Sequence, residues 1–455
     1  MTNYLDTVAQ FAANFSNTDI PDDVMDRTKL ILADSIGAIV GGAAEPEIRK
    51  LADRLCIKSL GACRVIGMQA MADPALASLL NGSAGTFLEM DEGNQFCKGH
   101  PGMHTIPACY AWAEENDVSG REFLAAIAIG YEVGARVGIA TNLRPAMHPH
   151  GTWGVICAAA GVGRLAGLDV VKMKTLLNIA SNMCLATSRP TMLEGGTVRN
   201  MYCGISGQLA TLAYNLVEAG FTGEHDGIQN VFGRVVSDTF CTTTMTEQLG
   251  CRWEVSRNYF KLHSCCRFNH AALDALDMIV QGSIGIKHIE NIARIDVATY
   301  SLAAELNDQS PVNTLAAKFS VPFAIATTLI NGTSKVTSFT WDAVGNSQIQ
   351  TLAKRVFVSE DREMTAKLPQ ARPAKVIVTM KDGTVLKAGT DTNRGDWRDP
   401  YSKAELYEKY HSLTQRLWGR GDGDAVYQQI MDLEQCTSLK PLGSLIAKAD
   451  IAANN

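Results

Sequence analysis

Apolar residues recur at helical spacing through most of the first half of the chain. Met25, Leu32, Ile36 and Val40 fall on one face of a predicted helix, which the paired glycines at 41 and 42 are expected to end. The same periodicity predicts further helices over residues 75–88, 123–139, 155–168 and 173–184. This part of the chain is therefore predicted to consist of helix after helix.

Three glycines stand four residues apart in the helix predicted at 123–139. Gly130, Gly134 and Gly138 share one face of that helix. A row of residues without side chains lets a second helix approach closely. We expect these glycines to serve helix packing rather than ligand binding.

The pattern changes after about residue 267. Residues 292–300 alternate in polarity and are rich in Ile and Val, and residues 356–358 form a second short apolar run, so both are predicted strands. Residues 375–380 and 384–388 flank an Asp-Gly pair, which is a strong hairpin signal. Helical spacing then returns at 402–417 and 425–433.

These patterns together predict the fold class and the domains. The protein is expected to be mostly α with an inserted α+β lid. Residues 1–267 and 396–455 are expected to form one large all-helical domain built from both chain ends, and residues 268–395 a smaller α+β domain.

Composition narrows the classes of function. The net charge is -6 with no basic block, which argues against nucleic acid as a partner. No run reaches the roughly 18 apolar residues of a membrane span. The 12 cysteines contain no CxxC pair, and the amino terminus lacks the pattern of a signal peptide. Free thiols and a cytoplasmic location are therefore expected.

The most polar stretch lies between two apolar segments, at residues 89–104. It holds the carboxylates of Glu89, Asp91 and Glu92 and the imidazoles of His100 and His104, with glycines and a proline interrupting any regular structure. Polar groups delivered by buried elements are typical of a small-molecule site. The alternative is a solvated loop without a role.

Other histidines and arginines gather in three further short motifs. His150 precedes a predicted buried helix, Arg199 lies in a glycine-flanked segment, and Lys261 and Arg267 bracket a histidine- and cysteine-containing run. Histidine with Asp suits proton transfer, and Arg can grip a carboxylate with two hydrogen bonds. These residues together indicate a substrate that carries carboxylates. The cationic side chains would stabilise the negative charge that develops on it during the reaction.

Two other chemistries are less well supported by the spacing. No metal is expected, because His100 with His104 and His148 with His150 lack the helical HExxH frame. A cysteine nucleophile is also disfavoured, because adjacent cysteines such as those at 265 and 266 are more often inert core thiols.

Short segments along almost the whole chain, in their order and spacing, resemble the MmgE/PrpD family. The segments are Asp19-Ile20-Pro21, Leu32-Ala33-Asp34-Ser35-Ile36-Gly37, Glu89-Met90-Asp91-Glu92, His100-Pro101, Lys261 with Cys265-Cys266, Ala317-Lys318-Phe319-Ser320 and Arg394-Gly395-Asp396. That family includes 2-methylcitrate dehydratase, cis-aconitate decarboxylase and iminodisuccinate epimerase. The resemblance implies a helical domain with an inserted lid, a homodimer and no metal or organic cofactor.

The resemblance also implies site residues. It places Asp91, His100, His150 and Lys261 in a catalytic site between the domains. Substrate binding is expected to involve four further residues: Glu89, His104, Arg199 and Arg267.

Two positions depart from the family pattern. Arg199 stands where the lyases commonly have a lysine, and arginine cannot act as an acid or base. Ser320 and Val321 stand where decarboxylase-type members present a tyrosine.

Three functions compete. The first is an epimerase of iminodisuccinate type, which tolerates both departures and would use His100 and Lys261 on opposite faces of the reacting carbon. Imidazole titrates near neutral pH, whereas Lys261 would need a lowered pKa. The second is a lyase that dehydrates or decarboxylates a small polycarboxylate. The third is a non-catalytic metabolite-binding protein.

Overall fold

A large helical body makes up most of the protein. The computed structural model describes residues 3–57, 59–282, 286 and 288–453. The long helices of the body before residue 260 are α1 (Tyr4–Asn14), α2 (Asp22–Ala43), α3 (Pro46–Cys56), α4 (Pro74–Phe87), α5 (Pro101–Asn116), α6 (Gly120–Ala140), α7 (Gly154–Leu165), α8 (Val170–Asn182) and α10 (Tyr202–Glu218). The five predicted helices are confirmed, but α2 continues through the glycines at 41 and 42.

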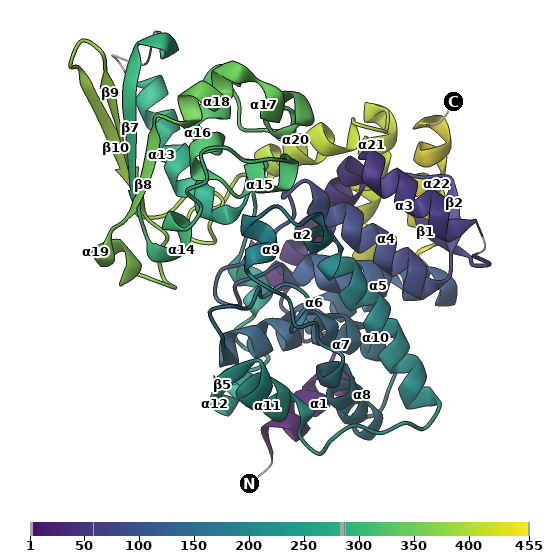
Figure 1. Cartoon of the computed structure of the whole chain (residues 1–455). Coiled ribbons are helices and arrows are strands. Elements are labelled where there is room, and N and C mark those ends of the chain that lie inside the picture. The colour runs from purple at the N-terminus through teal and green to yellow at the C-terminus, as the bar shows by residue number, and fades with distance from the viewer. Residues whose placement is uncertain (1–2, 58, 283–285, 287, 454–455) are drawn as a thin grey trace.

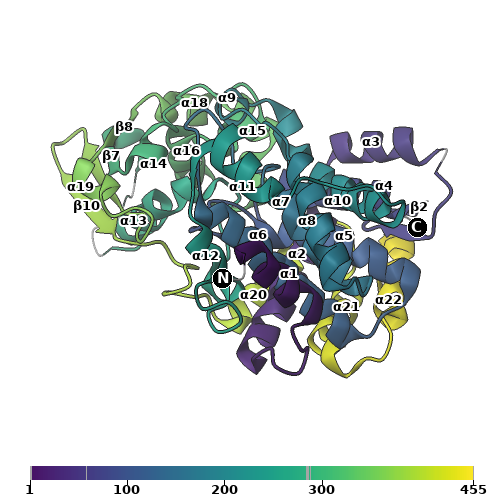
Figure 2. The ribbon, with the colours of Figure 1, turned by 90° about the horizontal axis from the view of Figure 1, so that it is seen from below.

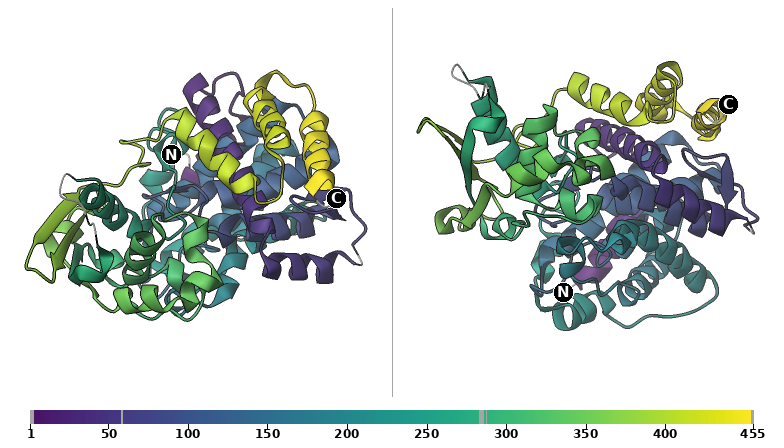
Figure 3. Two further views of the ribbon diagram at one scale, coloured as in Figure 1. Left: turned by 90° about the horizontal axis from the view of Figure 1, so that it is seen from above. Right: turned by 45° about the horizontal axis from the view of Figure 1, so that its top comes forward.

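The carboxyl-terminal helices return to this body. They are α20 (Lys403–Thr414), α21 (Arg420–Met431) and α22 (Lys440–Ala453). Figures 1 and 3 show them, in yellow, beside the purple helices from the start of the chain. The Lys409 ammonium on α20 contacts the Asp34 carboxylate on α2 and donates to the Met90 carbonyl, so the end of the chain supports the polar loop.

A close contact between α6 and α7 forms the centre of the body (Figure 2). A Cβ added at Gly130 would lie 2.6 Å from the Cys157 carbonyl oxygen, and one at Gly134 would overlap the Cys157 sulfur. The predicted packing role of the glycine row is confirmed at these positions. By length and hydropathy α6 also resembles a membrane span, but 94% of that window is buried within the protein, as expected for a core helix.

Gly134→Ala should lower the free energy of unfolding by about 1–3 kcal/mol, because the added methyl group overpacks the α6–α7 contact. Gly421→Ala is the control, since a Cβ there meets nothing within 4 Å at the start of α21. Thermal unfolding of both variants checks this. A Gly134→Ala protein as stable as the control would contradict the close packing.

The smaller unit contains a mixed four-stranded sheet in the order β10-β9-β7-β8. The strands are β7 (Ile292–Thr299), β8 (Val356–Glu360), β9 (Ala374–Met380) and β10 (Val385–Thr390). Strand β7 is parallel to β8 and antiparallel to β9, and the predicted β9–β10 hairpin turns at Gly383, whose φ is +88°. The predicted strands and the mostly helical fold class with a small α+β part are thus confirmed.

Helices cover the sheet and join it to the body. They are α13 (His270–Gln281), α14 (Ser301–Ala304), α15 (Thr314–Lys318), α16 (Val321–Asn331), α17 (Trp341–Gly345), α18 (Ser347–Ala353) and α19 (Arg362–Thr365). Sheet and helices enclose a hydrophobic core separate from that of the body. Figures 1 and 2 place the sheet at one end of the molecule and α3 at the other. The residue numbers of the domain boundaries stay a prediction.

The sequence had suggested an all-helical body, but the structure shows that the body also contains short strands. It contains three two-stranded ladders: β1 (Cys63–Val65) with β2 (Ala70–Ala72), β3 (Gly93–Asn94) with β6 (Asn258–Tyr259), and β4 (Thr141–Leu143) with β5 (Ser237–Phe240). Strands of two to four residues leave no periodic signal in a sequence. The β3–β6 ladder pairs Gly93 with Tyr259 and so joins the polar loop to the segment that carries Lys261.

Candidate active site

A pocket of about 290 Å³ lies between the helical body and the smaller unit. Its size is near the lower end for small-molecule sites. The body contributes Glu89, His100, His150 and Arg199 to the lining, and the chain beyond residue 266 contributes Arg267, Phe268, Phe319 and Arg372. Five of the eight predicted site residues therefore face one pocket, and Asp91, His104 and Lys261 are buried next to these five residues.

Five predicted residues form one connected network of charges. The Arg199 guanidinium contacts Glu89, the Lys261 ammonium lies 3.5 Å from both the Glu89 and the Asp91 carboxylates, and Asp91 contacts His100. All five side chains are at most 7% exposed. Glu89 also has a left-handed backbone, with φ of +54°, which non-glycine residues adopt mainly where the surroundings impose it.

The His100 ring is held through one nitrogen. Its Nδ1 lies 2.6 Å from the Glu92 carbonyl oxygen and 2.9 Å from Asp91 Oδ2. Both neighbours are acceptors, so Nδ1 carries the hydrogen and, in the neutral ring, Nε2 carries the lone pair. His100 is the residue before α5, whose first helical residue is Pro101.

The sequence had suggested Lys261 as a base, but its surroundings favour the protonated ammonium form. Burial alone would lower its pKa, but Asp91 and Glu89 raise the pKa above the ordinary value for lysine. Burial would likewise raise the pKa of Asp91, but His100 and Lys261 hold it well below its usual range. Lys261 is therefore a fixed ammonium at neutral pH. The lowered pKa that Lys261 would need to act as a base is not met, because the carboxylates outweigh desolvation.

Three cations, which we call the cationic wall, line the pocket beside Tyr259: Lys98, Arg267 and Arg372. The Arg267 guanidinium lies over the Tyr259 ring at 4.0 Å and pairs with Asp396 through Nη2. Its Nε and Nη1 have no hydrogen-bond partner among the described residues, and the Arg372 Nε likewise has none there. Partly unpaired guanidinium groups beside a pocket are suited to bind carboxylates.

The two positions that depart from the family pattern, Arg199 and Ser320, have different surroundings in the structure. Arg199 is paired with Glu89 and lies over the Phe319 ring at 5.2 Å, so it is less free to bind a ligand than Arg267. Ser320 caps α16 and donates to the Asp308 carbonyl oxygen instead of lining the pocket. The Tyr259 ring lies near His100, with ring centroids 6.3 Å apart.

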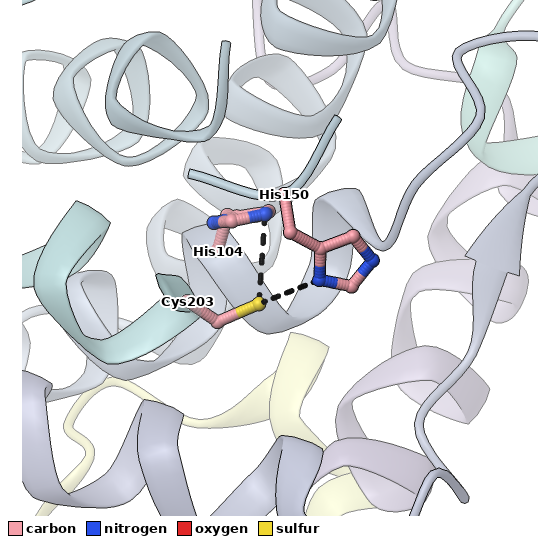
Figure 4. A group of neighbouring side chains, drawn as sticks. All are labelled: His104, His150 and Cys203. Carbon is pink, nitrogen blue, oxygen red and sulfur yellow. Dashed lines mark hydrogen bonds between the residues drawn. The ribbon is translucent and has the colours of Figure 1, made fainter. Parts of the chain in front are cut away.

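His104, His150 and Cys203 form a buried group (Figure 4), of which His150 lines the pocket. The Cys203 sulfur lies 3.5 Å from His104 Nε2 and 3.7 Å from His150 Nδ1. These three atoms could hold a metal ion, and so could His263, Asp274 and Asp277. Sequence reasoning missed the first set because Cys203 stands far from both histidines in the chain.

Prolonged treatment with EDTA should leave activity unchanged. The Nδ1 of His104 faces the backbone of Gly154, whereas metal-binding histidines nearly always donate their second N–H to an acceptor. Assays before and after chelation, with total metal measured, check this. Activity lost on chelation and restored by a divalent ion would contradict it.

Several other pocket residues were not predicted. Tyr259 stands two residues before Lys261, and this closeness in the sequence was a signal that could have revealed it. His148 was noted but given no role, and its Nδ1 accepts a hydrogen bond from the His150 backbone. Lys98 lies in the polar stretch at 89–104 but was given no role, and Arg372 had no signal, because single cations in loops are usually solvated.

The fold and the pocket together define a class of protein: a helical body with a smaller α+β unit and, between them, a pocket lined by histidine, carboxylate and arginine side chains. The chain belongs to the MmgE/PrpD family. Residues 6–243 match the MmgE/PrpD N-terminal domain, and residues 263–433 match the MmgE/PrpD C-terminal domain.

Curated relatives extend along nearly the whole chain. A cis-aconitate decarboxylase of Aspergillus terreus is 23% identical over 468 residues, covering 96% of this chain and 95% of the relative. The Mus musculus cis-aconitate decarboxylase is 22% identical over 93% of this chain and 90% of its own length. The Homo sapiens protein of the same name is 22% identical over 96% and 93%.

Proposed function

We propose that the protein is a cofactor-independent enzyme that moves a proton, or replaces a carboxylate by a proton, at a carbon next to a carboxylate of a small di- or tricarboxylate. The observation that carries the proposal is the His100 ring, which is hydrogen-bonded at Nδ1 to the Glu92 carbonyl oxygen with the Asp91 carboxylate 2.9 Å away, and which faces a pocket that also contains the cationic wall. A neutral imidazole held in this way can accept a proton at Nε2. The cations stabilise the negative charge that develops on the substrate.

A lyase of the decarboxylase or dehydratase type is the first candidate. Such a reaction can proceed with acid–base groups on a single face of the reacting carbon. The raised pKa of Lys261 makes its ammonium a weak proton donor, whereas an epimerase using His100 and Lys261 would need that ammonium to return the proton. The names of the relatives support a lyase as well.

An epimerase of iminodisuccinate type is the second candidate. Epimerisation requires neither a lysine at position 199 nor a phenol beside Phe319. A second imidazole, His150, lies with its ring centroid 4.4 Å from that of His100 and offers a group that could return the proton.

Proton NMR in deuterated water with a panel of polycarboxylates distinguishes these reactions. Loss of carbon dioxide or water would establish a lyase. Exchange of the α-proton with inversion and without elimination would establish an epimerase. A polycarboxylate that binds but undergoes no reaction would instead favour the non-catalytic metabolite-binding protein.

Arg267→Ala should raise KM by about 5- to 100-fold, because the variant loses a charge-assisted contact of about 1–3 kcal/mol with a substrate carboxylate. Arg199→Ala should also weaken binding, and in addition it should destabilise the fold by leaving Glu89 with Lys261 as its one remaining cation among the described residues. Steady-state kinetics and thermal unfolding separate the two effects.

Arg294→Ala serves as the control for these variants. Arg294 is half-exposed on the sheet and pairs with Asp296 away from the pocket. An Arg267→Ala protein with the KM of this control would show that Arg267 does not bind substrate.

A further inference from the structure

The Cys203 thiol lies between two imidazoles that cannot both receive its single proton. Cys203 is the second residue of α10, and its sulfur faces His104 Nε2 at 3.5 Å and His150 Nδ1 at 3.7 Å. All three side chains are buried. A thiol is one weak donor and one weak acceptor, so the direction of these two hydrogen bonds depends on the histidine tautomers.

The surroundings of His104 fix its tautomer. A Cβ added at Gly154 would overlap the Nδ1 of His104, so this nitrogen lies directly against the helix backbone. Nδ1 has no hydrogen-bond partner among the described residues. A buried N–H without an acceptor is costly, whereas a lone pair tolerates a C–H neighbour. The hydrogen of His104 is therefore on Nε2, which donates to the sulfur.

The direction of the second hydrogen bond follows. Since the sulfur accepts from His104, its own hydrogen is free to donate to Nδ1 of His150. Because Nδ1 accepts this hydrogen bond, the neutral His150 ring carries its one hydrogen on Nε2. Figure 4 shows this second nitrogen pointing away from Cys203.

We propose that Cys203 is a positioning residue that holds His150 in the tautomer with hydrogen on Nε2, opposite to the tautomer of His100. Two imidazoles with centroids 4.4 Å apart then offer different groups to the pocket: a lone pair on His100 and an N–H on His150. His100 can take a proton while the His150 N–H stabilises the negative oxygen that forms. This catalytic role rests on the proposed function; the tautomers do not.

A metal ion is the competing occupant of the same three atoms. Tetrahedral zinc would also place sulfur and nitrogen ligands at about these separations. However, the Nδ1 of His104 faces Gly154 and reaches no acceptor among the described residues, so the usual support for a metal-binding histidine is missing. The structure therefore favours the hydrogen-bonded thiol.

Long-range proton–nitrogen NMR of the full chain labelled with nitrogen-15 histidine tests the proposal without a substrate. In the wild type we expect hydrogen on Nε2 in His104 and His150 and on Nδ1 in His100. Cys203→Ala should release His150 into a mixture of tautomers, and Cys203→Ser should largely keep the wild-type state. Cys109→Ala, which removes another buried thiol, is the control and should leave the three signals unchanged.

Opposing results are equally definite. Hydrogen on Nδ1 of His150 in the wild type, or an unchanged His150 in Cys203→Ala, would overturn the proposal, as would one tightly bound metal ion per chain in the purified protein. If Cys203→Ala does not fold, the wild-type and Cys203→Ser spectra still decide the question.

An assay adds a second readout. Once a substrate is known, Cys203→Ala should lower kcat roughly three- to tenfold with little change in KM. The variant disturbs the hydrogen bond from the His150 N–H to the negative oxygen, which forms in the transition state. Cys203→Ser should recover most of that loss. If the tautomers are as expected but no polycarboxylate is turned over, the proposal for Cys203 stands. In that case only the proposed function is contradicted.

Discussion

His100→Gln should lower kcat by about 100-fold or more, the usual contribution of a positioned acid or base. Glutamine can replace the contact of His100 with the Glu92 carbonyl oxygen, but it has no group that accepts and releases a proton at neutral pH. The variant should still bind substrate, because the cationic wall is unchanged. Steady-state kinetics and the rate of α-proton exchange in deuterated water measure the effect.

The matched control is His225→Gln, which alters an exposed histidine outside the pocket. It should retain the wild-type kcat and KM. If His100→Gln kept a kcat within about threefold of this control, the proton would have to be carried by another group and the assignment of His100 as the base would be wrong.

Lys261→Met should reduce the free energy of unfolding by about 3–5 kcal/mol, because it leaves the buried Glu89 and Asp91 carboxylates without the cation that neutralises them. Turnover should fall as well, since Asp91 would no longer be held as the carboxylate that orients His100. The pKa of Asp91 should rise in the variant above its unfolded value. The stability deficit should therefore shrink as the pH is lowered.

A double variant separates charge compensation from packing. Glu89→Gln removes one of the two carboxylates, so it should restore part of the stability of Lys261→Met although it adds no apolar contact. Denaturant unfolding of the two single variants and the double variant measures the coupling. Effects that simply add would show that Lys261 does not compensate Glu89.

The sequence predicted the long helices and the hairpin well, because each depends on local periodicity. It also pointed to the polar loop, since charges between apolar segments are visible without a structure. The state of Lys261 could not be predicted, because it depends on Glu89 and Asp91, which the β3–β6 ladder brings near from a distant segment. Arg372 was missed because its place in the pocket depends on how the smaller unit docks.

Protein synthesis produces the acidic loop long before its partners. Asp91 precedes Lys261 by 170 residues, and Met90 precedes Lys409 by 319 residues. Burying the Glu89 and Asp91 carboxylates without a cation costs several kcal/mol per charge, so the loop cannot enter the interior of an unfinished chain. We expect ribosome-bound chains that end before Lys261 to keep this loop hydrated and open to proteases. Docking of α20 should then be one of the last steps of folding.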